Sequence, residues 1–208
     1  MLQPNTLSTE TLFPQSQREM QKQLLPLSIT LLLLLSTLRS TEATIRIVIG
    51  TCHASSYLTG KSGFCTTQND ADCCQEGQLY PQYRCSPPVT ANTNAVMYIG
   101  SFSQGSDGGS ATACDGKFYA DNETVVALST GWFNGGSRCL KTIRINGNGN
   151  LVTAKVVDEC DSVNGCTADL NYEPPCGPNA ITASPAVWDG LGVPETQRSE
   201  LVVTWSEL

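Results

Sequence analysis

The sequence is poor in the residues that metal sites and nucleic-acid sites need. It contains a single histidine, His53, and no two cysteines at CxxC spacing. Zinc fingers combine such cysteine pairs with histidine ligands, so we expect no metal and no cofactor, and we interpret His53 as a surface residue. The 12 lysines and arginines occur singly and form no patch beside aromatic residues. Binding to a phosphate backbone requires such a patch, so no nucleic-acid partner is expected.

No apolar run is long enough to cross a membrane. The run Leu24–Leu35 has about a dozen residues, whereas a spanning helix needs roughly 20, and its length is typical of the core of a signal peptide. Residues 1–43 are therefore predicted to be a signal peptide that is cleaved after Ala43, and the mature protein is predicted to be extracellular, in the apoplast or cell wall, and not membrane-bound. The polar residues 1–19 are unusual before such a core, and translation from Met20 would give an ordinary signal peptide.

The chain is acidic, with a formal net charge of −7. An acidic surface keeps a secreted protein soluble, but it does not identify a substrate. Because no amphipathic stripe accompanies this charge, we expect a monomer.

Cysteine is abundant, but it is absent from the first fifty residues. An even number of cysteines in a secreted chain predicts a disulfide framework. We expect all ten cysteines to form disulfide bonds: Cys52, Cys65, Cys73, Cys74, Cys85, Cys114, Cys139, Cys160, Cys166 and Cys176. Their spacing does not determine the connectivity, which stays open at this point.

Composition divides the mature chain into a small module and a larger domain. Residues 44–85 are rich in cysteine and poor in aliphatic residues, so disulfides must supply the stability that a core cannot. The proline-containing segment 86–95 is predicted to be an extended linker, and residues 96–208 form the main domain. The run Thr44–Gly50 is predicted to be a strand. One further possibility is that the module is cut off near Ser86 and acts as a free peptide.

Short apolar runs separated by turn residues predict an all-β main domain. Its central feature is a hairpin, in which Ile143–Ile145 and Leu151–Val157 flank the glycine- and asparagine-rich turn 146–150. Further strands are predicted at Val96–Phe102, Val125–Leu128 and Leu201–Trp205. One short helix is predicted over 184–192, because the capping residue Ser184 is followed by a proline. These elements indicate a β-barrel or a β-sandwich.

Candidate binding residues follow the second strand of the hairpin. Asp158 and Asp161 end this strand, Asp107 lies in a glycine-rich loop, and Trp132 could stack on a sugar from a glycine-rich turn. Each has a structural alternative: the two carboxylates that end the strand could order the loop by accepting backbone N–H bonds, and the tryptophan could pack in the core. The sequon that begins at Asn122 predicts a surface glycosylation site.

Four longer motifs carry a family resemblance: DADCC from Asp70, YPQYRCSPPVT from Tyr80, ALSTGWFNGGSRC from Ala127 and VVDECD from Val156. They resemble the kiwellins, secreted plant proteins that are also described as ripening-related, over essentially all of Cys52–Leu208. The resemblance implies a six-stranded double-psi β-barrel, as in barwin and the expansins, with a small disulfide-rich N-terminal module. It also implies a role in plant defence through binding, and inhibiting, a secreted pathogen protein such as a fungal chorismate mutase.

The same resemblance bears on enzymatic activity, because the wider barrel family contains enzymes. Glycoside cleavage usually needs two carboxyl groups. Asp158 matches the aspartate at the end of the barrel strand that rare lipoprotein A uses, but Thr182 occupies the second acidic position of expansins and related hydrolases. A threonine hydroxyl is a poor general acid, so we expect no catalysis. The alternative is a protein that binds or modifies cell-wall glycans through Asp158 and Asp161, with Trp132 as a platform.

Overall fold

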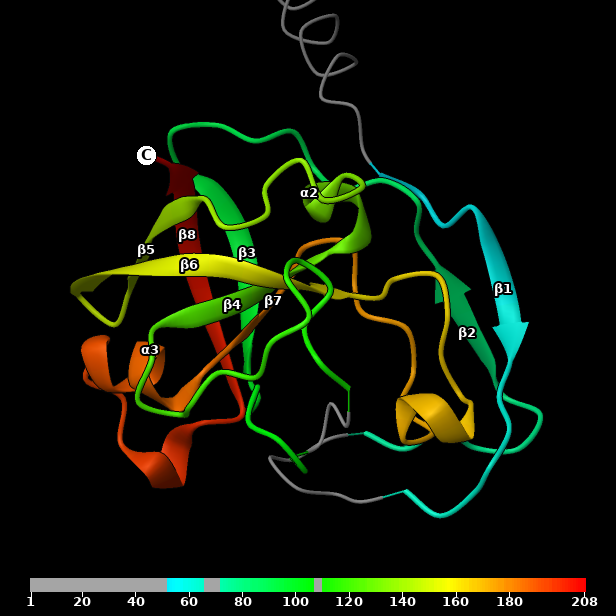
Figure 1. Cartoon of the computed structure of the whole chain (residues 1–208). Coiled ribbons are helices and arrows are strands. Elements are labelled where there is room, and N and C mark those ends of the chain that lie inside the picture. Colours follow the sequence, from blue (N-terminus) through cyan, green and yellow to red (C-terminus); the bar gives the residue numbers. More distant parts are fainter. Residues whose placement is uncertain (1–51, 66–71, 107–109) are drawn as a thin grey trace, which may run out of the picture. The chain divides into compact units, whose positions relative to one another are not determined.

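Six strands form a closed barrel in the computed structural model, which describes residues 52–65, 72–106 and 110–208 (Figure 1). The strands are β3 (Thr93–Ile99), β4 (Val125–Ser129), β5 (Thr142–Gly147), β6 (Asn150–Cys160), β7 (Ala180–Ala183) and β8 (Glu200–Glu207). Around the barrel their order is β3-β7-β4-β6-β5-β8, and β8 pairs again with β3. The β3/β7 and β4/β6 pairs are parallel, and the other pairs are antiparallel. The predicted all-β, six-stranded barrel is confirmed.

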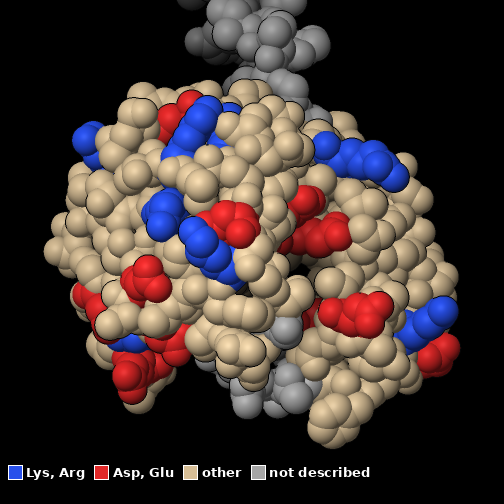
Figure 2. All heavy atoms as spheres, in the orientation of Figure 1, with Lys and Arg blue, Asp and Glu red and all other residues tan. Residues whose placement is uncertain are grey.

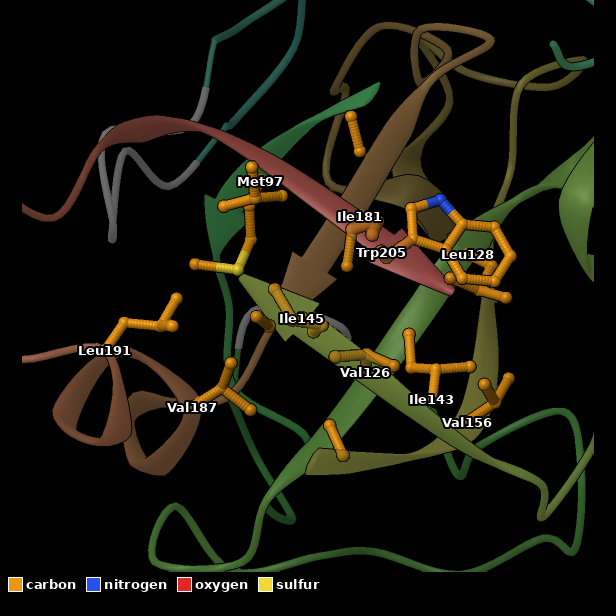
Figure 3. Packing of buried hydrophobic residues seen from close by; sticks show 14 of the residues in the cluster. Met97, Val126, Leu128, Ile143, Ile145, Val156, Ile181, Val187, Leu191 and Trp205 are labelled. Atoms are coloured by element: carbon orange, nitrogen blue, oxygen red, sulfur yellow. The ribbon is translucent and has the colours of Figure 1, made fainter. Parts of the chain in front are cut away.

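Alternation of side chains along the strands fills the barrel with apolar residues. In β3, Ala95 and Met97 are buried whereas Asn94 and Tyr98 are exposed, because successive side chains point to opposite faces of a strand. Figure 3 shows the resulting core, which includes Met97, Val126, Leu128, Ile143, Ile145, Val156, Ile181, Val187, Leu191 and Trp205. Closure of the barrel also pairs both edges of its sheet, so this core is held in a rigid frame.

Strand β4 is buried along its whole length. Its outward residues Val125 and Ala127 belong to a second, smaller apolar cluster, to which Phe102 and Tyr119 contribute from the segments between β3 and β4. This outer layer explains why the sequence of β4 is a continuous apolar run rather than an alternating one.

Two short α-helices occur among the described residues, where the sequence predicts one. They are α2 (Thr130–Phe133) and α3 (Pro185–Gly190), and two 3-10 turns accompany them, η2 (Ala168–Leu170) and η3 (Glu195–Gln197). Helix α3 confirms the predicted helix, with Ser184 at the N-cap position. However, the Ser184 hydroxyl makes no capping bond; it donates to the carbonyl of Glu123 and accepts from the Val125 N–H. Helix α2 was missed because four residues give no helical period.

Several boundaries differ from the predicted ones. Strand β7 was not predicted, because its four residues include two alanines and show no alternation. Strand β3 begins at Thr93, inside the predicted linker 86–95. The signal peptide 1–43 and the strand Thr44–Gly50 lie outside the described residues. Within the described ranges, no helix has the length and apolarity to span a membrane.

The N-terminal part of the described chain contains a separate two-stranded sheet. Its strands, β1 (Ser56–Thr59) and β2 (Leu79–Gln82), are antiparallel. All of their residues are exposed or half-buried, as expected for a segment with few aliphatic residues. The bridges Cys52–Cys85 and Cys65–Cys73 cross-link this segment.

All ten cysteines form disulfide bonds, as predicted, and the pairing that the sequence left open is now defined. The bonds are Cys52–Cys85, Cys65–Cys73, Cys74–Cys166, Cys114–Cys139 and Cys160–Cys176. Cys74–Cys166 joins the N-terminal module to the loop that follows β6. A cut near Ser86 would therefore leave the module covalently attached, which argues against its release as a free peptide.

Candidate functional site

A groove of about 480 Å³ lies against the outer face of β3, β7, β4 and β6. These strands form its floor, and its walls come from residues 100–106 after β3 and from residues 161–177 after β6, with Asp72 of the N-terminal module also lining it. In Figure 2, acidic side chains border a hollow on this face of the molecule. The groove is therefore our candidate binding site.

The strand register places a row of side chains across the groove floor. Asp158 of β6 pairs with Ala127 of β4, and Ala127 pairs on its other side with Thr182 of β7. Thr182 pairs in turn with Tyr98 of β3, which pairs with Glu200 of β8. Residues paired in register share one face of a sheet. Two strand spacings put the backbones of Asp158 and Thr182 about 10 Å apart, and the small Ala127 leaves the space between them open.

A local irregularity turns Asp158 outward. The register of β4 against β6 shifts between Val126 and Ala127, so that Val126 pairs with Val156 whereas Ala127 pairs with Asp158. Strict alternation would give Asp158 the same inward direction as Val156. An extra residue in one strand reverses that alternation, and Asp158 consequently lines the groove instead of the core.

Asp158 is a half-buried carboxyl group held by two backbone hydrogen bonds. One of its oxygens accepts from the N–H groups of Ala113 and Glu159, both at 2.9 Å. Burial raises the pKa of Asp158 above its ordinary value of 3.8, and these two hydrogen bonds oppose the shift without cancelling it. A carboxyl with a raised pKa holds a proton more readily, which suits a proton donor, but that chemistry needs a second carboxylate nearby.

No carboxylate occupies the second position. Thr182 lies there, and its hydroxyl donates to the Sγ of Cys160 at 3.2 Å. Gly100 approaches from the other side so closely that a Cβ on it would lie 2.4 Å from the Thr182 side chain. Glu200 is the acidic residue at the far end of this row. It lies on β8, and strands β7 and β3 separate it from Ala127 on β4. The row thus has the broken carboxylate pair that the sequence predicts.

Asp161 also lines the groove, but its oxygens are engaged in its own loop. One oxygen accepts from the backbone N–H groups of Val163 and Asn164 at 2.7 and 2.8 Å, and the other accepts from the Asn164 amide at 2.8 Å. This is the loop-ordering alternative named in the sequence analysis. Asp161 therefore contributes charge to the groove while it stabilises the wall.

The prediction that Trp132 lines a groove is wrong. Trp132 is only 1% exposed and packs edge-on against Trp205 with ring centroids 5.1 Å apart. Its indole N–H donates to the carbonyl of Pro87 at 2.8 Å, so the core alternative holds. Trp132 lies in helix α2, where it is buried together with Phe133. Asp107 lies outside the described residues, and Asn122 is exposed in a turn, as a glycosylation site requires.

Several groove residues escaped the sequence analysis. They are Asp72, Tyr98, Asp169 and Glu173. The acidic pattern of the segment after β6 could have pointed to Asp169 and Glu173. Nothing local points to Asp72 or Tyr98, because their proximity depends on the barrel closure and on the Cys74–Cys166 bond. Among the described residues, no group of three or more His, Cys, Asp or Glu side chains could hold a metal ion.

These features define a class of protein: a disulfide-cross-linked six-stranded barrel with a carboxylate-lined groove on its outer face. The Kiwellin-1 family model matches residues 22–208. The chain belongs to the kiwellin family.

Named relatives agree with this assignment. Ripening-related protein 3 of Oryza sativa subsp. japonica is 51% identical over 160 residues, covering 75% of each chain. Kiwellin of Actinidia chinensis var. chinensis is 46% identical over 145 residues, covering 69% of this chain and 67% of that one.

Solved structures with a similar barrel are more distant. An apo expansin of Clavibacter michiganensis aligns with a TM-score of 0.42 and 18% identity, over 56% of this chain and 50% of that one. The Streptomyces papain inhibitor aligns with a TM-score of 0.39 and 16% identity, over 57% and 96%. Likenesses of this size carry no functional argument.

Proposed function

We propose that this protein is a secreted, non-enzymatic plant defence protein that binds, and inhibits, a secreted protein of a pathogen. Its membership of the kiwellin family supports a role of this kind, and a fungal chorismate mutase is the partner that the family resemblance implies. The observation that carries the non-enzymatic part is the position of Thr182. It faces Asp158 across Ala127, where hydrolysis would need a carboxylate.

The scaffold supports a binding role. Five disulfides and a closed barrel hold the segments that border the groove. Loops on such a frame can differ in sequence without loss of the fold, and they lose little entropy on binding because they are already ordered. A protein of this construction binds a partner by surface complementarity.

Binding of cell-wall glycans is the second candidate function. One observation favours it: a groove of about 480 Å³ on the face of the barrel that carries Asp158. Because Trp132 is buried, the glycan hypothesis loses the aromatic platform that the sequence suggested, and Tyr98 is the exposed aromatic residue among the groove's described lining residues.

The test is binding of the purified secreted chain to two immobilised panels. One panel holds secreted pathogen proteins, including chorismate mutase, and the other holds cell-wall polysaccharides. Saturable binding to one protein, without glycan retention, is the expected result. Glycan retention that Asp158→Asn abolishes, or release of reducing ends from the polysaccharides, would overturn the proposal. The same chain after reduction and alkylation is the control for nonspecific adsorption.

A further inference from the structure

The groove is lined by acidic side chains in the part of the chain that the structure describes. Six acidic side chains line it, and none of its described lining residues is lysine, arginine or histidine. The ion pairs of Asp115, Asp189 and Glu207 lie outside the groove lining. A concave surface lined by one sign of charge attracts ligands of the opposite sign, so the groove selects for a cationic ligand.

Several of these carboxylates are fixed before any ligand binds. Backbone N–H groups hold Asp158 and Asp161, and the Thr130 hydroxyl donates to Glu159 at 2.6 Å. Charges held in place cost little entropy when a ligand binds to them. The groove is in this sense preorganised.

The carboxylates are spread along the groove instead of converging on one point. Asp72 comes from the N-terminal module, Asp158 from β6 on the floor, and Asp169 from η2 in the wall. Convergence of at least three such groups, which a metal ion would need, does not occur among the described residues. A ligand that meets all of these charges must itself be elongated and carry several separated positive charges.

Apolar surface lies among the charges. Tyr98 and Leu170 line the groove and are 39% and 38% exposed. Burial raises the pKa of the Tyr98 hydroxyl, and the charges of Glu200 and Asp72 raise it further, which agrees with carboxylates lying around this ring. Lysine and arginine combine a cationic head with a long aliphatic stem, and an aromatic face attracts a cation directly.

We propose that the groove binds an extended, lysine- or arginine-rich segment of the protein partner. The cationic heads lie among the carboxylates, and the stems lie along Tyr98 and Leu170. This inference rests on the proposed function for the existence of a protein partner. A neutral glycan could stack on Tyr98, but it would desolvate the carboxylates without balancing their charge.

The test uses a fluorescent oligolysine of about ten residues as the probe, and fluorescence anisotropy with the full secreted chain as the readout. The groove variant Asp72→Asn/Asp169→Asn removes two charges from exposed side chains. The matched control Glu76→Gln/Glu195→Gln removes two exposed charges outside the groove. We expect saturable one-to-one binding that weakens about tenfold in the groove variant, or about 1.4 kcal/mol, and less than about twofold in the control. Raising the salt from about 50 to 200 mM should weaken it as well.

Four results would overturn the inference. Equal weakening in the groove variant and the control would show general attraction to an acidic surface. Spermine binding as tightly as the oligolysine would point to a small polyamine, and groove-dependent retention of cellohexaose would point to a glycan.

Capture of a secreted pathogen protein separates this inference from the proposed function. If the groove variant captures that protein as well as the control does, only this inference fails. If oligolysine binding depends on the groove but no secreted protein is captured, the proposed function fails, and only the preference of the groove for cationic peptides stands.

Discussion

The Cys74–Cys166 bond is the most informative place to perturb the structure. Cys74 and Cys166 are 4% and 1% exposed, and their bond connects the N-terminal module to the wall of the groove. The double substitution Cys74→Ala/Cys166→Ala removes this connection without burying a new polar group.

The loss of stability follows from the loop that the bond closes. The two cysteines are 92 residues apart, and the Cys114–Cys139 bridge, which spans 25 residues, shortens the effective loop. For a loop of roughly 70 residues, the chain-entropy relation gives about 4 kcal/mol. The matched control, Cys65→Ala/Cys73→Ala, opens a bridge with a separation of only 8, for which the same relation gives about 2.5 kcal/mol.

The assay is guanidinium unfolding without reductant, followed by limited proteolysis between the module and β3. We expect the free energy of unfolding to fall more in Cys74→Ala/Cys166→Ala than in the control. After a cut near Ser86, only this variant should release a separate module on a non-reducing gel. The hydrogen bonds from Gln82 to Val163 and from the Tyr83 N–H to Ser162 still join module and wall in the variant, so release requires denaturing conditions. A change below about 1 kcal/mol, or a free module from the wild type, would refute the reasoning.

Three further predictions concern single residues. Trp132→Ala should lower the free energy of unfolding by about 3–5 kcal/mol, because the ring is buried and hydrogen-bonded to the Pro87 carbonyl. Chemical denaturation measures this change. A variant that keeps its stability but loses glycan retention would contradict a core role. Burial raises the pKa of Asp158 above 3.8, so its protonated form stabilises folding at low pH, and that contribution is lost as the pH rises through the folded-state pKa. Asp158→Asn should flatten this part of the pH–stability curve, and equal curves for variant and wild type would contradict the assignment. Burial and a hydrogen bond to Asp115 raise the pKa of Tyr119 to about 12, so the stability it contributes is present below pH 10 and lost as the pH rises through about 12. Tyr119→Phe should remove a tyrosinate absorbance step near pH 12, and loss of a step near pH 10 instead would contradict this.

The sequence by itself determined the features that depend on local pattern and chemistry. Apolar runs between glycine- and asparagine-rich turns predicted β5 and β6 as a hairpin, and Ser184 followed by proline predicted α3. The hairpin prediction succeeded because turn residues act within a few residues. The helix prediction succeeded because a proline at the first helical position has a helical φ, although Ser184 makes no capping bond. The even number of cysteines predicted complete disulfide pairing for the same reason: the chemistry requires no knowledge of the fold. The family motifs supplied the barrel and the replacement of the second carboxylate by Thr182.

Only the tertiary structure decided which residues form the groove. Asp158 faces outward because the β4/β6 register shifts by one residue, and alternation along β6 alone would have buried it. Trp132 faces inward because α2 directs it onto Trp205. Asp72 joins the site because Cys74 bonds to Cys166, one of many pairings that spacing allows. Each outcome depends on contacts between segments far apart in the chain, and such contacts leave no periodic signal in the sequence.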